Sequence, residues 1–159
     1  MTATTHPADD LHGYYLEDLQ AGMRASYART VTEADVVLFA GLSGDNNPVH
    51  INEEFAANTP FKGRVVHGMF SAALLSCVAG TRLPGPGAIY VDQSLKFRAP
   101  VRIGDTVTAT VTIKEIDLQR RRVTADTVCT VAGKPVVTGT GTYLVDRRPT
   151  PEGNGPEGA

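Results

Sequence analysis

The sequence predicts an α+β domain in which an antiparallel sheet is wrapped around one long helix. Residues 67–82 are apolar or small on every side of a helical wheel and contain no Asp or Glu, so we expect other elements to bury this helix on all sides. The segments that follow it alternate between apolar and polar residues, which is typical of antiparallel strands with one face in water. A sheet that covers a helix of this kind is α+β packing.

Composition indicates one soluble domain. The chain has 159 residues, is 42% hydrophobic and 20% charged, and carries a net charge of -2. This charge argues against a general binder of nucleic acid or of anionic membranes, and no apolar run approaches the ~20 residues of a membrane span. The N-terminus lacks the pattern of a signal peptide, so we expect a cytoplasmic protein. Cys77 and Cys129 are too far apart for a metal motif and are interpreted as small buried residues.

The two ends of the chain differ from its middle. Residues 1–12 are polar and predict a flexible arm, whereas residues 147–159 predict a disordered tail because the last eleven positions contain three prolines and three glycines. A single domain is therefore expected over residues 13–146.

The first half of this domain carries clear start and stop signals. Residues 23–31 are short and mixed in character, as in an edge strand. Thr32 followed by Asp35 resembles a capping box, and the helix that it begins should end at Gly44. A loop is expected next. Asn52 then caps a second, short helix, with two glutamates in the first turn.

The second half is strand-like. Residues 83–87, with the sequence LPGPG, end the apolar helix. The alternation of the next segment places four apolar residues on one face: Ile89, Val91, Leu95 and Phe97. The period-2 pattern continues without a fault over residues 106–113, and two further strands are expected over residues 123–131 and 135–145.

The segment over residues 43–50, SGDNNPVH, is the most unusual in the chain. Asp45 and His50 are five residues apart, which fits neither helical spacing, so they meet only if the loop folds back. Pro48 and Asn47 restrict this loop. A carboxylate and an imidazole aimed at one point can hold a water molecule and move its protons. The alternative is an Asx turn with a structurally satisfied histidine.

Two further features lie on the apolar helix. Gly68, directly after His67, would let a ligand approach the free N–H groups at the positive end of the helix dipole, as in an oxyanion hole. An ordinary helix start is the alternative. Ser76 is a polar residue in a buried helix, and such a serine usually bonds back to a backbone carbonyl.

The segment Phe39–His50, FAGLSGDNNPVH, followed by Ala56, resembles the signature of the MaoC-like (R)-specific enoyl-CoA hydratases without departure. The similarity continues through residues 66–69, Ser76, residues 89–97 and the turn at residues 100–105. It covers almost all of the expected domain. The resemblance implies a hotdog fold and a homodimer, or a higher homo-oligomer, whose sheets join. It also implies a coenzyme A thioester as substrate, with no cofactor and no metal.

The resemblance also implies roles for individual residues. Asp45 and His50 match the catalytic pair that adds water across a trans-2-enoyl-CoA to give the (R)-3-hydroxyacyl-CoA. Gly68 matches the residue whose N–H bonds the thioester carbonyl. Ser76 matches a supporting residue of the active site, and Asn47 and His67 are expected to support the loop and the helix start.

Weaker candidates for substrate binding are polar or basic residues near these motifs. Gln93 interrupts an apolar stripe and either faces the acyl tunnel or marks a bulge or a satisfied core amide. Three basic residues are candidates for contacts with the substrate: Lys62, Arg64 and Arg98. The run Arg120–Arg122 is interpreted as a solvated turn, with binding of coenzyme A phosphates as the alternative.

Three other functions compete with the hydratase. A 3-hydroxyacyl-[acyl carrier protein] dehydratase would use the same chemistry on another carrier. A hotdog thioesterase is disfavoured, because many of these enzymes use an acid on or near the central helix and residues 67–82 have none. A non-catalytic acyl-CoA-binding protein would not need Asp45 and His50 together in a shaped loop.

Overall fold

The structure is a computed structural model that describes residues 11–149. These residues form a five-stranded antiparallel sheet with the strand order β1-β3-β4-β5-β2. The first ten residues of the expected arm and residues 150–159 of the expected tail lie outside the described residues, so the flexibility predicted for them stays a prediction.

All the strands expected from the sequence are present. β1 lies at one edge of the sheet, as expected, and β2 lies at the other. The strands are β1 (Arg24–Thr30), β2 (Ile89–Phe97), β3 (Thr106–Asp117), β4 (Arg122–Val131) and β5 (Lys134–Leu144). The alternation in β3 has the predicted consequence, because the side chains of Val107, Ala109, Val111 and Ile113 are almost completely buried.

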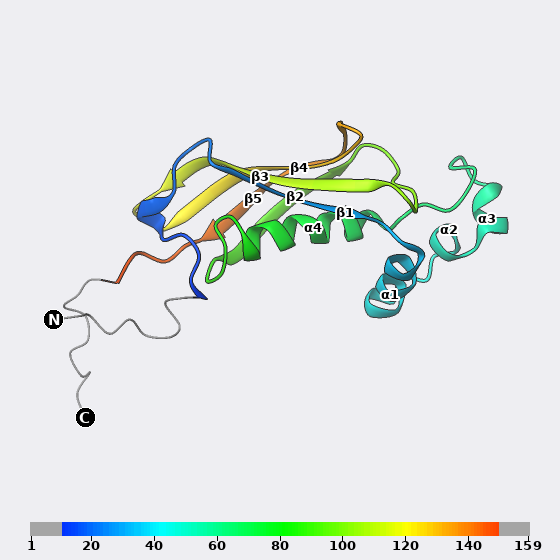
Figure 1. Ribbon diagram of the computed structural model, residues 1–159, viewed down its shortest axis with the longest axis horizontal. Helices are drawn as coiled ribbons and strands as arrows, with labels where there is room; N and C mark the ends of the chain where they lie inside the picture. Colours follow the sequence, from blue (N-terminus) through cyan, green and yellow to red (C-terminus); the bar gives the residue numbers. More distant parts are fainter. Residues whose placement is uncertain (1–10, 150–159) are drawn as a thin grey trace, which may run out of the picture.

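The long helix α4 (Gly68–Thr81) lies along one face of the sheet and contacts all five strands (Figure 1). Its buried residues, among them Leu75 and Val78, form one core with the inward residues of the strands. Such burial of apolar surface stabilises the fold by about 25 cal/mol per Å². A sheet wrapped around a central helix is the hotdog fold, which confirms the predicted α+β class.

The prediction that this helix is buried on every side is wrong for the single chain. Met69, Ala73, Ser76 and Gly80 follow one another at helical spacing on the side away from the sheet, and all four are exposed. The reason is geometric, because a sheet covers only one side of a helix. The uniform apolar character of the sequence does not reveal which side stays uncovered.

Three shorter helices gather at one end of the sheet (Figure 1). They are α1 (Glu33–Ser43), α2 (Pro48–Ile51) and α3 (Glu53–Ala57), and a 3-10 turn, η2 (Leu16–Asp18), precedes β1. α1 and α3 confirm the predicted helix starts. α2 was not predicted, because a single turn held by Asn47 as N-cap and Pro48 at its first position is too short to show periodicity. In residues 11–149 no helix is long and apolar enough to span a membrane.

The predicted apolar face of β2 is only partly correct. The register of β2 against β5 shifts between Tyr90 and Asp92, which is a β-bulge at Val91. As a result Ile89 and Val91 are exposed, whereas Tyr90 and Leu95 pack against the core. The period-2 rule fails here because one extra residue in a strand reverses the direction of the side chains that follow.

The start of α1 is anchored by a buried carboxylate. Asp35 accepts hydrogen bonds from the backbone N–H and the hydroxyl of Thr32, at 2.9 and 2.8 Å, and from the guanidinium of Arg29 on β1. These hydrogen bonds, above all the one from Arg29, lower the pKa of Asp35 to about 2. The helix is therefore fixed to the edge of the sheet through one ionised side chain.

We predict that Asp35→Asn lowers the free energy of unfolding by about 1–2 kcal/mol at pH 7. Because the folded pKa is below the ordinary value of 3.8, this stabilisation is present above pH 4 and is lost as the pH falls towards 2. Urea unfolding of both proteins between pH 2 and pH 7 measures this difference. Asp126→Asn, at an exposed site paired with Lys114, is the control. A difference that does not change with pH would contradict the assignment.

A second prediction concerns the contact between α4 and β2. A Cβ atom at Gly68 would lie 2.7 Å from the ring of Phe97, whereas nothing lies within 4 Å of a Cβ atom at Gly41 in α1. We therefore expect Gly68→Ala to destabilise the protein by about 1–3 kcal/mol, and Gly41→Ala to stabilise it by up to about 1 kcal/mol. Thermal unfolding of the two variants tests this, and equal effects would contradict it.

Candidate active site

Three hydrogen bonds between residues close in sequence, each of 3.2 Å, shape the loop between α1 and α2. The Ser43 hydroxyl accepts from the N–H of Asp45, the carboxylate of Asp45 accepts from the N–H of Asn47, and the amide oxygen of Asn47 accepts from the N–H of Val49. Each is a contact between residues i and i+2, the geometry that Ser, Asp and Asn favour in turns. The loop therefore folds back on itself, and Asn47 supports it as predicted from its type.

The fold-back brings Asp45 and His50 together. His50 Nε2 lies 3.9 Å from Asp45 Oδ2, and the imidazole is mostly buried while the carboxylate is half-exposed. His50 Nδ1 lies 2.7 Å from the carbonyl oxygen of Val65. Because a carbonyl only accepts, Nδ1 carries the proton of the neutral ring and the lone pair of Nε2 faces Asp45. A water molecule about 2.8 Å from both atoms fits this geometry.

His67 contacts both members of the pair, Asp45 and His50. It is 1% exposed, and its Nε2 donates to the backbone carbonyl of Asp45 at 2.9 Å. Its ring stacks on His50 with centroids 3.8 Å apart, and Phe39 of α1 packs against it at 5.1 Å. His67 is also the N-cap of α4, so a single residue joins the loop, the imidazole of His50 and the start of the central helix.

A cavity of about 450 Å³ opens beside this pair. Its wall contains Asp45, the first turn of α4 and the end of β2; the lining residues are Asp45, Phe61, Val66, His67, Gly68, Met69, Phe97, Arg98, Ala99 and Pro100. The N–H groups of the first turn of a helix have no partner within the helix, and they carry the positive end of its dipole. The cavity thus joins a carboxylate, an apolar wall and a set of backbone donors.

The structure brings most of the predicted residues together, but it places Ser76 and Gln93 elsewhere. Ser76 lies two turns further along α4, about 12 Å from Gly68 at the rise of a helix, on the uncovered side. Gln93 does not line the cavity and bonds to Thr127 Oγ1, at 2.9 Å, and to Tyr90. A bulge precedes Gln93, and its amide is satisfied within the sheet, in agreement with the structural alternative.

The three basic candidates have different surroundings. Arg98 lines the cavity, and its Nε donates to Thr138. Arg64 is bound by the carboxylates of Glu33 and Glu53, and the hydrogen bonds that it donates to Glu33 raise its pKa. Lys62 lies with Arg64 around a separate depression of about 370 Å³. Of the three, only Arg98 faces the same cavity as Asp45.

Cys129 offers no activated nucleophile. Cys129 is fully buried, and desolvation raises the pKa of its thiol to about 12, so the thiol stays protonated. Cys77 is free and partly buried in α4.

Sequence reasoning missed several residues of the site. The carbonyl of Val65 fixes the tautomer of His50, and the rings of Phe61 and Phe97 form part of the cavity wall. Nothing in the sequence indicates a backbone carbonyl as a partner, because every residue has one. The aromatic residues were available as candidates, but their contribution depends on how three separate segments converge.

The cluster of Asp45, His50 and His67 is also the candidate for metal binding among the described residues. Asp45, His50 and His67 each offer a ligand atom within 4.8 Å of the others, and a carboxylate with two imidazoles is a donor set that suits Zn²⁺. His67 Nε2, however, donates to the carbonyl of Asp45 and so carries a proton, which leaves only its buried Nδ1 as a ligand atom. The hydrogen bonds present suit a bound water molecule between Asp45 and His50 better.

Comparison with known proteins gives relatives that are named as hydratases or dehydratases of coenzyme A thioesters. The chain is 59% identical over 141 residues to an (R)-specific enoyl-CoA hydratase from Rhodospirillum rubrum, which covers 89% of this chain and 98% of that protein. It is 45% identical over 139 residues to a 3-hydroxybutyryl-CoA dehydratase from Methylorubrum extorquens, with 87% and 88% covered.

The fold and the family agree with these relatives. The unliganded R-hydratase PhaJ1 from Pseudomonas aeruginosa superposes with a TM-score of 0.80 at 40% identity, covering 86% of this chain and 88% of that one. Residues 17–136 match the family model of the MaoC like domain. The resemblance noted in the sequence is thereby confirmed, and the chain belongs to the MaoC-like domain family.

Proposed function

We propose that this protein catalyses the reversible, (R)-specific hydration of trans-2-enoyl-CoA thioesters to (R)-3-hydroxyacyl-CoA, as a hydro-lyase. The observation that carries the proposal is that Asp45 Oδ2 and His50 Nε2 face each other, and that Asp45 lines a cavity with a largely apolar wall. Relatives that are 59% and 45% identical are named as a hydratase and a dehydratase of coenzyme A thioesters, which supports the same substrate class.

The pair would activate the water that adds to the double bond. Water is a weak nucleophile at neutral pH, so a base must take up its proton as its oxygen bonds to C3 of the enoyl group. In our proposal Asp45 and His50 hold this water between them and return a proton to C2 on the same face. The product gains one O–C3 bond and one H–C2 bond, and dehydration reverses both steps.

The start of α4 would stabilise the charge that develops on the thioester. As C3 is attacked, negative charge moves to the thioester oxygen, and a backbone N–H aimed at this oxygen is worth about 10²–10³-fold in rate. Gly68 is the first residue of α4 and lines the cavity. Because Gly68 has no side chain, its N–H stays accessible beside Phe97. We therefore propose that this N–H donates a hydrogen bond to the thioester carbonyl.

We predict that the protein removes the ultraviolet absorbance of the conjugated enoyl thioester when it is added to crotonyl-CoA, and that the product is the (R)-alcohol. Asp45→Asn and His50→Ala should each lower kcat by about 10²–10⁴-fold, because each removes one half of the acid–base pair. Asp126→Asn, an exposed aspartate on β4, should keep full activity. Added EDTA should leave the rate unchanged.

Other outcomes would separate the alternatives. Activity on a crotonyl-[acyl carrier protein] but not on crotonyl-CoA or longer enoyl-CoAs would favour the carrier-protein dehydratase. Release of free coenzyme A would indicate a thioesterase. Unchanged binding of acyl-CoA by both variants, without turnover by any of the proteins, would indicate a non-catalytic binding protein.

We further propose that the protein is a homodimer in which the β2 strands of two copies pair edge to edge. β2 is an edge strand whose exposed residues include Ile89, Val91 and Phe97, and the uncovered side of α4 with Met69 and Ser76 is apolar or small. Exposed apolar edges of this kind are rare in monomers. Pairing would extend the sheet across both copies and cover apolar surface that the single chain leaves in water.

We expect sedimentation equilibrium to give twice the mass of the chain. Val91→Lys, which places a charge on the β2 edge, should weaken self-association at least tenfold, because a buried unpaired charge costs several kcal/mol. Leu118→Lys, at an exposed apolar site in the turn between β3 and β4, is the matched control. A monomeric native protein, or equal effects of the two substitutions, would refute the dimer.

A further inference from the structure

We propose that Arg102, in the connection between β2 and β3, is a positioning residue for the reaction. It holds the loop over residues 61–65 in one conformation, and this loop in turn fixes the imidazole of His50. Arg102 itself contacts neither Asp45 nor His50. The inference rests on the proposed hydratase function, and it concerns how the imidazole of His50 is kept oriented towards Asp45.

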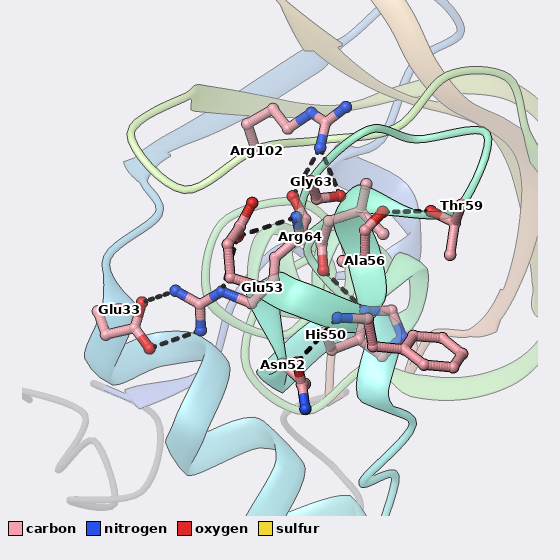
Figure 2. A network of polar contacts seen from close by, with 11 residues as sticks. Glu33, His50, Asn52, Glu53, Ala56, Thr59, Gly63, Arg64 and Arg102 are labelled. Carbon is pink, nitrogen blue, oxygen red and sulfur yellow. Dashed lines mark hydrogen bonds and ion pairs between the residues drawn. The ribbon is translucent and has the colours of Figure 1, made fainter.

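Three backbone carbonyls of the loop accept hydrogen bonds from the Arg102 guanidinium. Nη1 donates to the carbonyls of Gly63 and Arg64, both at 2.8 Å, and Nη2 donates to the carbonyl of Phe61. Figure 2 shows the guanidinium directed at Gly63 and Arg64. The rigid fork of arginine can satisfy several acceptors at once, which a lysine ammonium cannot do with the same geometry. Within residues 11–149 no carboxylate forms an ion pair with Arg102, so its charge is directed at these carbonyls.

The loop has a conformation that needs such support. Lys62 has a φ of 57°, in the left-handed region that side chains other than glycine seldom adopt. Gly63 follows with a φ of 149°, and a Cβ atom there would meet Glu53 Oε1 at 3.1 Å and Arg102 Nη1 at 3.4 Å. The peptide is therefore enclosed between α3 and Arg102. Strained conformations of this kind persist only where the surroundings determine them.

The next residue of the loop carries the effect to His50. The carbonyl of Val65 accepts a hydrogen bond from His50 Nδ1, with 2.7 Å between nitrogen and oxygen, and it directly follows the carbonyls that Arg102 binds. The N–H of Val65 donates to Val49 of α2, and the N–H of Val66 donates to Val101, the neighbour of Arg102. The segment is thus held between the β2–β3 connection and α2. If the loop turns, the acceptor that keeps the Nε2 lone pair facing Asp45 is displaced.

Arg102 is itself fixed by a tight turn. Its N–H donates to Asp105 Oδ2 at 2.8 Å, and the N–H of Asp105 donates to its carbonyl at 3.1 Å. Asp105 also accepts from the N–H of Val31, directly before α1. The guanidinium is therefore connected to the sheet edge through a rigid base, as a residue that positions another group requires.

Arg64 performs a separate task in the same region. Its guanidinium binds Glu33 of α1 and Glu53 of α3, and Figure 2 shows it between these two carboxylates. This ion pair network joins two helices through side chains. Arg102 instead binds backbone carbonyls. The peptide groups before Val65 are held by these carbonyl contacts together with two N–H contacts, from Arg64 to the carboxylate of Glu53 and from Val65 to the carbonyl of Val49.

The test compares Arg102→Met and Arg102→Lys with Arg24→Met. Methionine keeps the length of the side chain without its donors, and lysine keeps the charge without the fork. Arg24 is exposed at the start of β1. The readouts are kcat and KM for crotonyl-CoA and the tautomer of His50 in a long-range ¹H–¹⁵N correlation spectrum. Circular dichroism establishes that each variant is folded at the temperature of the assay, and Arg102→Lys serves if Arg102→Met does not fold.

We expect Arg102→Met to lower kcat at least tenfold with KM within about twofold, since misplacing a catalytic group by 1 Å costs up to about 10²-fold. The His50 spectrum should change from the Nδ1–H tautomer to a mixture. Arg102→Lys should show a smaller change in both readouts, and Arg24→Met should match the wild type.

Three results would overturn the inference. A higher KM with unchanged kcat would make Arg102 a contact for the substrate. A change in only one of the two readouts would show that Arg102 does not act on His50 through Val65. Values equal to those of Arg24→Met would exclude any positioning by Arg102. If the wild type does not hydrate crotonyl-CoA, the proposed function fails, while the tautomer of His50 still decides whether Arg102 positions it.

Discussion

The packing of α4 against the sheet is the interaction on which the rest of the structure depends. A helix with no acidic residue, and with apolar side chains such as Leu75 and Val78 on its sheet side, is stable only when other elements cover it. The same packing determines where α4 begins. Its first turn meets the end of β2 at Gly68 and Phe97, and the cavity and the free backbone donors of the helix lie there. The site is therefore a consequence of how the core is closed.

The proposed acid–base pair of Asp45 and His50 depends on a second constraint, which is that polar groups with little exposure need hydrogen-bond partners. Leaving a buried donor or acceptor unpaired costs about 1–3 kcal/mol. His67 Nε2 and His50 Nδ1 meet this demand by donating to the carbonyls of Asp45 and Val65, whereas the buried Nδ1 of His67 has no hydrogen-bond partner among the described residues. Each of the two hydrogen bonds also fixes which nitrogen carries the proton. The contacts that satisfy these two nitrogens are therefore the same ones that give the rings the orientation required by our proposed proton transfer.

The surroundings of the pair are assembled from segments far apart in sequence, and charge holds them in place. Asp35 ties α1 to β1, Arg64 ties α1 to α3, and Arg102 ties the loop before α4 to the β2–β3 connection. All three contacts lie outside the apolar core. They position helices that are too short to be stable alone, since an isolated helix of fewer than about 12 residues is marginal in water. The apolar core therefore stabilises the fold, and the polar contacts fix the positions of the short helices and of the loop before α4.

The sequence by itself determined the elements that local chemistry controls. Thr32 with Asp35 and Asn52 predict the starts of two helices, and the alternation around Val107 predicts a strand, because these signals depend on neighbours a few residues away. The signature around Asp45 and His50 identified the family and predicted the catalytic pair. Only the tertiary structure decided which side of α4 stays uncovered, where the bulge at Val91 reverses a strand, and that Val65 and Arg102 lie beside the site. Carbonyls, bulges and uncovered faces leave no mark in composition or spacing, because they arise when distant segments compete for the same space.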